Sequence, residues 1–210
     1  MMRAYRTVQK EAEIELIIQK SRFIGRCFPV TEEEQALNLL AQLRKQHWDA
    51  SHNCFAYCIG TDGSTARFSD DGEPSGTAGL PMMEAIRQKG LVDVLCVVTR
   101  YFGGVLLGAG GLVRAYSKAA SMSMEEAGIV EMRPCVTLLV KTDYARFAVI
   151  EPLLRRDGTL KEVRYMEDVE ADLAVPEADV EAFIKTLVEK TDGRVHPKET
   201  GIAYGAFPVA

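Results

Sequence analysis

The sequence lacks any apolar run long enough to cross a membrane. Its longest apolar stretches, such as LVDVLCVVT at residues 91–99, are interrupted by charge and fall short of the ~18 residues that a spanning helix needs. The first residues, MMRAYRTVQKEAEIE, lack the apolar core of a secretory signal. We therefore expect a soluble, cytoplasmic protein without a membrane partner.

Cysteine is scarce as well. The five cysteines are an odd number without a CxxC pair, which favours a reduced compartment and small buried thiols. His52, Cys54 and Cys58 fall on one face of a predicted strand, but six residues at ~3.3 Å each place the two ends ~20 Å apart. These three side chains cannot share a metal ion, and neither a metal site nor a cofactor is expected.

Positive charge is not in excess. Residues 1–133 hold 15 basic and 16 acidic side chains, residues 134–210 hold 10 and 14, and the net charge is −5. Non-specific binding to nucleic acids depends on neutralising phosphates, so such a role would need a local basic patch. Sequence-specific recognition of DNA is not expected.

Hydrophobic periodicity predicts the order ββαββαβα for the first half of the chain. Thr31 and Glu34 have capping-box spacing at the start of the first helix, where Leu37, Leu40 and Leu43 follow at helical spacing. The last strand, LVDVLCVVTRYF, is apolar on both faces, as expected of a central strand. The predicted elements cover residues 13–18, 22–28, 31–46, 52–60, 64–69, 79–90, 91–102 and 112–128.

The second half alternates as βαββαβ, which is the order of a ferredoxin-like domain. Asp143 is a predicted helix N-cap, and Gly158 and Gly193 follow the two helices. We expect an α+β protein with domains at residues 1–133 and 134–210. The elements of the second domain cover residues 135–141, 143–156, 160–165, 169–175, 177–190 and 195–204.

Five glycines lie between the last strand and the last helix of the first half. Such a density predicts positive φ angles or a close neighbour, and the N–H groups of a helix that follows favour an anion. The candidate anion-binding residues are Arg100, Gly103, Gly104, Gly108, Gly110, Gly111, Arg114 and Lys118. A P-loop is excluded because Ala109 and Gly110 occupy its Lys and Ser/Thr places, and the GxGxxG dinucleotide pattern is not matched.

A second loop, FSDDGEPSGTAGLP, carries acidic residues that complement these cations. We expect the two loops to lie side by side in one concave surface. The carboxylates either form structural ion pairs with the cations or belong to a ligand site, and the sequence leaves both open. The candidate residues of this loop are Asp70, Asp71, Glu73, Ser75, Gly76 and Thr77.

An enzymatic alternative uses His52, Asp70, Asp71 and Ser75. These are residue types suited to general-base or nucleophilic chemistry, although no known motif spacing joins them. The carboxylates of DDGE could also hold Mg²⁺ with a substrate phosphate. A lone histidine at a strand start is more often structural, so we favour a binding protein over an enzyme.

SDDGEPSGTAGLP followed by VVTRYFGGVLLGAGGLVRAY, with DASHNCFAY upstream, resembles the signature of the YigZ/IMPACT family. The resemblance implies a first domain similar to the second domain of a small-subunit ribosomal protein and a ferredoxin-like second domain. Together these are similar to the last two domains of elongation factor G. Eukaryotic relatives regulate translation through a further domain that this sequence does not match, so that domain's partner is not expected here.

The resemblance therefore favours a translation-associated regulator. We expect it to bind structured RNA or the ribosome through the glycine-rich loop. The alternative is an enzyme that acts on a phosphorylated or nucleotide-like small substrate. The oligomeric state is left open.

Overall fold

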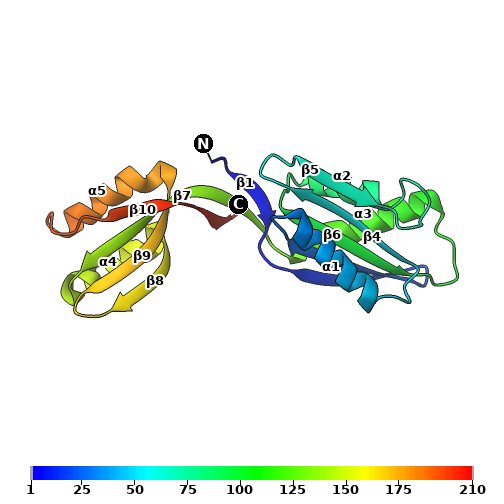
Figure 1. The fold of residues 1–210 in the computed structure, drawn as a ribbon, viewed down its shortest axis with the longest axis horizontal. Helices are drawn as coiled ribbons and strands as arrows, with labels where there is room; N and C mark the ends of the chain where they lie inside the picture. The colour runs from blue at the N-terminus through cyan, green and yellow to red at the C-terminus, as the bar shows by residue number, and fades with distance from the viewer. Residues whose placement is uncertain (1, 210) are drawn as a thin grey trace. The chain divides into compact units, whose positions relative to one another are not determined.

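The computed structural model describes residues 2–209 and divides them into two compact units (Figure 1). One unit comprises Tyr5–Glu131 with residues 208 and 209, and the other comprises Met132–Phe207 with residues 2–4. The boundary predicted at residue 133 falls inside strand β7 (Ile129–Thr142), which contains the change from one unit to the other. Among residues 2–209, no helix has the length and apolarity needed to span a membrane.

An antiparallel five-stranded sheet forms the centre of the first unit, in the order β2-β3-β6-β4-β5. β6 occupies the middle position that its two apolar faces predict, and seven of its eight residues are buried. His52 pairs with Arg100 across β4 and β6, so two candidate residues lie at the same end of the sheet. The strands are β2 (Ala12–Ile18), β3 (Ser21–Pro29), β4 (His52–Ile59), β5 (Thr65–Ser69) and β6 (Val94–Tyr101).

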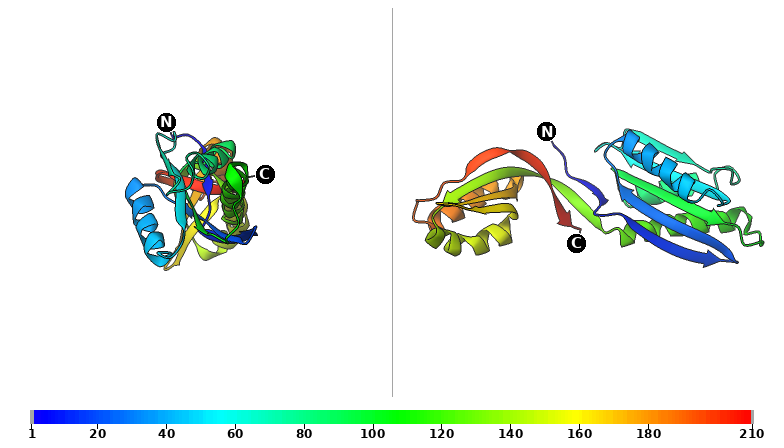
Figure 2. Two further views of the ribbon diagram at one scale, coloured as in Figure 1. Left: turned by 90° about the vertical axis from the view of Figure 1, so that its right-hand side faces the viewer. Right: turned by 60° about the horizontal axis from the view of Figure 1, so that its bottom comes forward.

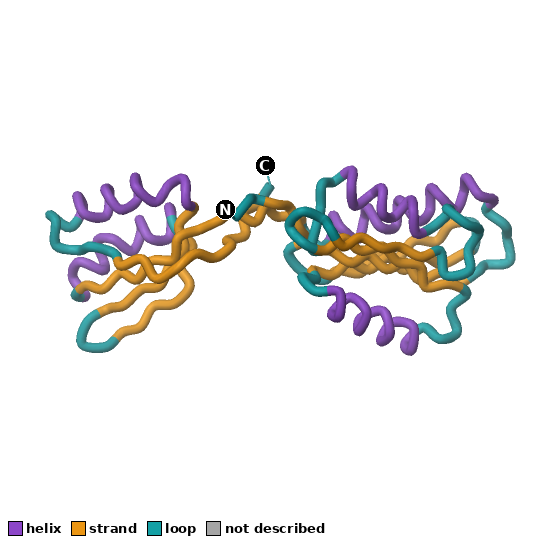
Figure 3. Tube along the Cα trace, turned by 45° about the horizontal axis from the view of Figure 1, so that its top comes forward, coloured by secondary structure: helices purple, strands orange, loops and turns teal. Residues whose placement is uncertain are grey.

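Helices cover both faces of this sheet (Figures 2 and 3). The alternating side chains of β6 explain the two layers, because Val94, Cys96 and Val98 face α2 (Gly79–Gln88) and α3 (Gly108–Glu126). Leu95 and Val97 face α1 (Glu33–Gln46) on the other side. Each large buried side chain contributes about 1.5–3 kcal/mol relative to its exposed state.

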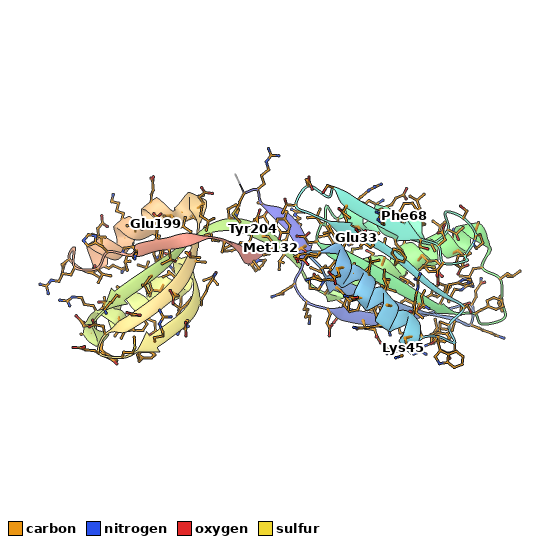
Figure 4. The ribbon with its side chains drawn as sticks, in the orientation of Figure 1. Glu33, Lys45, Phe68, Met132, Glu199 and Tyr204 are labelled. Atoms are coloured by element: carbon orange, nitrogen blue, oxygen red, sulfur yellow. The ribbon has the colours of Figure 1, made fainter. Side chains whose placement is uncertain are left out.

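The first turn of α1 is anchored differently from the prediction. The helix has Glu32 at its N-cap without a side-chain cap, so the predicted Thr31/Glu34 capping box is wrong. Gln35 instead accepts a hydrogen bond from the Thr31 backbone N–H at 3.0 Å. Glu33 accepts from Arg67 at 2.8 Å and from the Tyr57 hydroxyl, which ties the helix to the sheet (Figure 4).

Two further features of the first unit depart from the prediction. Leu37 is 52% exposed because the buried stripe of α1 runs through Ala36, Leu40 and Leu43 instead. The short strand β1 (Tyr5–Val8) was not predicted, and it pairs with β7. Four residues are too few to show a periodicity, so only the partner strand makes β1 recognisable.

The second unit has the predicted βαββαβ order, and its strands form the sheet β10-β7-β9-β8. Asp143 caps the first helix by accepting a hydrogen bond from the Arg146 N–H, as predicted. Val169, Ala171, Leu173 and Val175 of β9 face the helices, which lie together on one side of the sheet (Figure 3). The remaining elements are α4 (Tyr144–Asp157), β8 (Thr159–Tyr165), β9 (Val169–Pro176), η1 (Glu177–Asp179), α5 (Val180–Lys190) and β10 (Lys198–Pro208).

The five glycines near α3 lie in three different environments. A Cβ on Gly103 would lie 2.0 Å from the backbone carbon of Lys20, so only glycine allows this approach to the β2–β3 turn. Gly104 and Gly108 have φ angles of +79° and +69°. Gly110 and Gly111 lie within α3, which begins earlier than predicted, and neither has a positive φ; a Cβ on Gly111 would lie 3.0 Å from Leu107 Cβ, so only Gly110 lacks both a positive φ and a close approach.

All five cysteines are buried and unpaired. Burial is the main reason that the pKa of Cys54 is raised to about 12, and burial also raises the pKa of Cys58 and Cys135. The Cys27 pKa is raised chiefly by its contact with the Cys96 thiol. The side chains therefore pack as small apolar groups, in agreement with the prediction from the sequence.

We expect Gly103→Ala to destabilise the protein and Gly110→Ala to leave it as stable or more so. The first change forces a methyl group against the Lys20 backbone, and overpacking of this kind costs about 1–3 kcal/mol. The second replaces a helical glycine in ordinary space, where alanine is better by up to about 1 kcal/mol. Urea denaturation of the two variants measures the difference, and equal stabilities would contradict the close approach.

We also expect the native thiols to resist alkylation. A pKa raised from 9.0 to about 12 leaves the Cys54 thiol with roughly a thousandfold less reactive thiolate at pH 8. Iodoacetamide should modify all five cysteines in denaturant but none rapidly in the native protein, as counted by mass spectrometry. A native cysteine that reacts as fast as N-acetylcysteine would show that its burial is incorrect.

Candidate functional site

The two loops meet in one hollow of about 390 Å³, which confirms the prediction that they share a concave surface. Glu73 and Pro74 come from the acidic loop, and the segment from Phe102 to the first turn of α3 forms the facing side. His52 and Arg100, paired at the ends of β4 and β6, complete the lining. We call this feature the Glu73 hollow.

A buried ion pair lies at the base of the Glu73 hollow. Arg100 Nη1 donates to Glu73 Oε1 at 2.6 Å, and the two side chains are only 6% and 3% exposed. The Tyr116 hydroxyl of α3 donates to the same oxygen at 2.7 Å, and His52 Nε2 lies 3.8 Å from it. Burial, followed by the neighbouring Cys54 thiol, raises the Tyr116 pKa far above its usual value, so the hydroxyl remains a donor.

Arg100 is therefore not a free phosphate-binding cation. Its guanidinium packs against the rings of Phe23 and Phe102 and donates through Nη2 to Ser21 Oγ at 3.3 Å. Its Nε is the one buried side-chain nitrogen or oxygen in residues 2–209 that has no hydrogen-bond partner. The sequence left two alternatives open for the cations, a structural ion pair or a ligand site. For Arg100, the structure shows the ion pair.

Asp70 organises the acidic loop rather than the hollow. Its carboxylate accepts hydrogen bonds from the backbone N–H groups of Gly76, Ala78 and Gly79, at 2.8, 3.0 and 2.8 Å. Burial by itself would raise the pKa of Asp70, but these three donors outweigh it and lower the pKa. The residue fixes the chain at the start of α2.

Asp71 has a similar structural role. Its two oxygens accept from the Asn53 backbone at 2.6 Å and from Arg44 at 3.1 Å, and its φ angle is +43°. Its carbonyl faces His52 Nδ1 at 2.8 Å. Asp71 therefore joins the acidic loop to β4 and α1.

The residues of the enzymatic alternative are only partly brought together. Of His52, Asp70, Asp71 and Ser75, the Glu73 hollow is lined by His52 alone, and Ser75 is exposed. Gly76 provides a φ angle of +77°, and the Thr77 hydroxyl donates to the Pro74 carbonyl at 2.6 Å. Within residues 2–209, no three His, Cys, Asp or Glu side chains are grouped so that they could hold a metal ion.

Arg114 and Lys118 lie outside the Glu73 hollow. They are exposed and line a separate groove of about 220 Å³ with Gln19 and Gly111. Arg114 Nη1 lies 3.5 Å from the position of a Cβ on Gly110, so the guanidinium lies beside the first turn of α3. Two of the three predicted cations therefore remain together at the helix start, separate from Arg100.

Lys20 is a basic residue that the sequence reading missed. It is exposed in the β2–β3 turn, where its φ angle is +67°, and Gly103 packs on its backbone. The polar pair Gln19-Lys20 between two apolar runs could have indicated a two-residue turn. No local pattern indicates that this turn lies beside the glycines near α3. Gln19, the neighbour of Lys20 in this turn, lines the groove with Arg114 and Lys118, and we call Lys20, Arg114 and Lys118 the basic cluster.

We expect Glu73→Gln to destabilise the protein strongly, because it leaves the buried Arg100 charge without a counter-ion. Breaking one side of such a pair costs about 3–5 kcal/mol, whereas replacing both partners by apolar residues is much less costly. Urea denaturation should therefore find Glu73→Leu/Arg100→Met more stable than Arg100→Met alone. Additive losses would show that the two groups do not interact.

Comparison with known proteins identifies both units. Residues 19–124 match the model of the Impact N-terminal domain, and residues 140–194 match a domain of unknown function. The chain is 42% identical over 205 residues to IMPACT family member YvyE of Bacillus subtilis (strain 168), covering 97% of this chain and 94% of that protein. IMPACT family member YigZ of Escherichia coli (strain K12) is 35% identical over 179 residues, covering 84% and 88%.

A solved structure described as a crystal structure of a hypothetical protein has the same fold. It superimposes with a TM-score of 0.61 at 32% identity and covers 95% of this chain and 98% of its own. The Impact N-terminal domain spans the strands and helices that form both the Glu73 hollow and the basic cluster. With relatives matched over most of their length in both units, this chain belongs to the IMPACT family.

Proposed function

We propose that this protein is a translation-associated factor that binds the phosphate backbone of structured RNA, including ribosomal RNA, through the basic cluster. The observation that carries the proposal is that these three cations are available to a ligand. All are exposed, and none has an ion-pair partner among residues 2–209. By contrast, Arg22 and Arg26 on β3 are held by Glu15 and Glu13, at 2.8 and 2.7 Å.

The helix start adds to the attraction for phosphate. Arg114 lies beside the first turn of α3, so the positive end of the helix dipole adds to its attraction for phosphate, whereas Gly108 and Ala109 of that turn line the Glu73 hollow instead. Contacts of this kind position RNA but carry no base information. Among the aromatic residues nearby, Phe102 is 49% exposed whereas Tyr116 is fully buried, so stacking on bases is at most a minor part of the interaction.

Family membership supports a role in translation. The resemblance noted above relates these domains to a small-subunit ribosomal protein and to elongation factor G, and a likeness of this kind favours structured RNA as the ligand. The enzymatic alternative has less support, because the Asp70 and Asp71 carboxylates are engaged by backbone N–H groups of the acidic loop and of β4, and only His52 of the four candidates lines the Glu73 hollow.

We expect RNA binding to weaken steeply with salt. Three phosphate contacts to single-stranded or loop RNA give a slope of log K against log salt of about −2, and Lys118→Ala should flatten it by roughly 0.7. Fluorescence anisotropy of a labelled RNA stem-loop, together with co-sedimentation with ribosomes, would measure both quantities.

Lys45→Ala is a matched control for this experiment. Lys45 is an exposed lysine in the last turn of α1, on the other face of the sheet (Figure 4). Its loss should leave the slope unchanged. If neither the RNA nor ribosomes bind at low salt, or if the two lysine variants behave alike, the basic cluster is not an RNA site.

A further inference from the structure

The Glu73 hollow leaves large apolar side chains uncovered around a polar base. Leu106 is 85% exposed and Phe102 is 49% exposed, although both line the hollow. Leu107 and Leu112 extend the apolar wall towards α3. Apolar walls with a few polar groups at one end are typical of sites for small organic molecules, and about 390 Å³ is near the lower end of their usual range.

The polar end of the hollow contains donors without acceptors. Arg100 is 5% exposed and lines the hollow, yet its Nε has no hydrogen-bond partner. A buried N–H without an acceptor is destabilising, and a ligand oxygen would satisfy it. Gly108 and Ala109 of the uncapped first turn of α3 line the same space, and the N–H groups of a first turn have no partner within the helix.

The charges in the hollow limit the ligand to one negative group. Glu73 already neutralises Arg100, so a dianionic phosphate would place two further negative charges beside a buried carboxylate. A single carboxylate has two oxygens, one for the Arg100 Nε–H and one for the helix N–H groups. His52 Nδ1 donates to the Asp71 carbonyl at 2.8 Å, and its Nε2 lies 3.8 Å from Glu73 Oε1 at the edge of the hollow.

We infer that the Glu73 hollow binds a small carboxylic acid with an apolar or aromatic body. The carboxylate is received by Arg100 Nε and by the first turn of α3, and the body lies against Phe102, Leu106 and Leu107. This site is independent of the basic cluster, since neither Arg114 nor Lys118 lines the hollow.

Phenylacetate is a suitable probe, with neutral 2-phenylethanol and inorganic phosphate as comparisons. In nitrogen-15 NMR spectra of the full chain, phenylacetate should shift the amides of Gly108 and Ala109 and the Arg100 Nε–H signal. The neutral alcohol should bind about tenfold more weakly, because it cannot form the charged hydrogen bonds. Phosphate should leave these signals in place.

Ala109→Pro removes one donor while retaining the helix, since proline is tolerated in a first turn. Phenylacetate affinity should fall about tenfold in this variant. Leu106→Asp, a change at an exposed position, should also weaken binding through like-charge repulsion. Leu37→Asp on α1 is the matched control, because Leu37 is another exposed leucine outside the hollow.

The RNA experiment separates this inference from the proposed function. Lys118→Ala should weaken RNA binding and leave phenylacetate binding unchanged. The inference is overturned if phenylacetate causes no shifts at the hollow up to roughly 10 mM, the level of a very weak site. It is equally overturned if Ala109→Pro and Leu106→Asp bind phenylacetate like the parent, or if phosphate shifts the same signals as strongly.

Discussion

The ion pair between Glu73 and Arg100 determines the architecture of the whole candidate site. It joins the acidic loop to the end of the central strand, and Tyr116 attaches the same carboxylate to α3. A buried pair is tolerable only when further hydrogen bonds satisfy its remaining atoms, and Tyr116 and Ser21 supply these bonds to Glu73 Oε1 and Arg100 Nη2, leaving only Arg100 Nε without a partner. The loops on either side are consequently held against one scaffold, despite their glycine content.

This pairing divides the start of α3 into two surfaces with different chemistry. On the side of the hollow, positive charge is cancelled internally and the walls are apolar, which favours a small ligand. On the opposite side, the basic cluster keeps its charge, which favours a polyanion. Arg100, Arg114 and Lys118 look equivalent in the sequence but have different surroundings, because only Arg100 lies within reach of Glu73.

Local patterns were sufficient to predict most of the fold. The hairpin of β4 and β5, helix α2, the central strand β6 and the whole βαββαβ half follow from periodicity and from glycine and proline positions. The site was less accessible to this reasoning, because Glu73 and Arg100 are 27 residues apart and their burial depends on tertiary packing. Gly103 illustrates the limit. The density of glycines around it indicated a close approach, but the register between β3 and β6 determines that its neighbour is Lys20.

A protein with a net negative charge can still bind RNA if its cations are grouped at one surface and its acidic side chains are engaged by other groups of the protein. The net charge of −5 is spread over the whole chain, whereas salt at physiological strength screens charges beyond about 8 Å. A phosphate beside Arg114 therefore responds mainly to the basic cluster and to the helix start, not to acidic groups elsewhere. Asp70 directs its oxygens to backbone N–H groups of its own loop, and Asp71 directs its oxygens to the Asn53 N–H and to Arg44, so both carboxylates are already engaged within the protein. If RNA binds here as proposed, three cations limit the contacts to a few phosphates, and such binding would be weak and reversible.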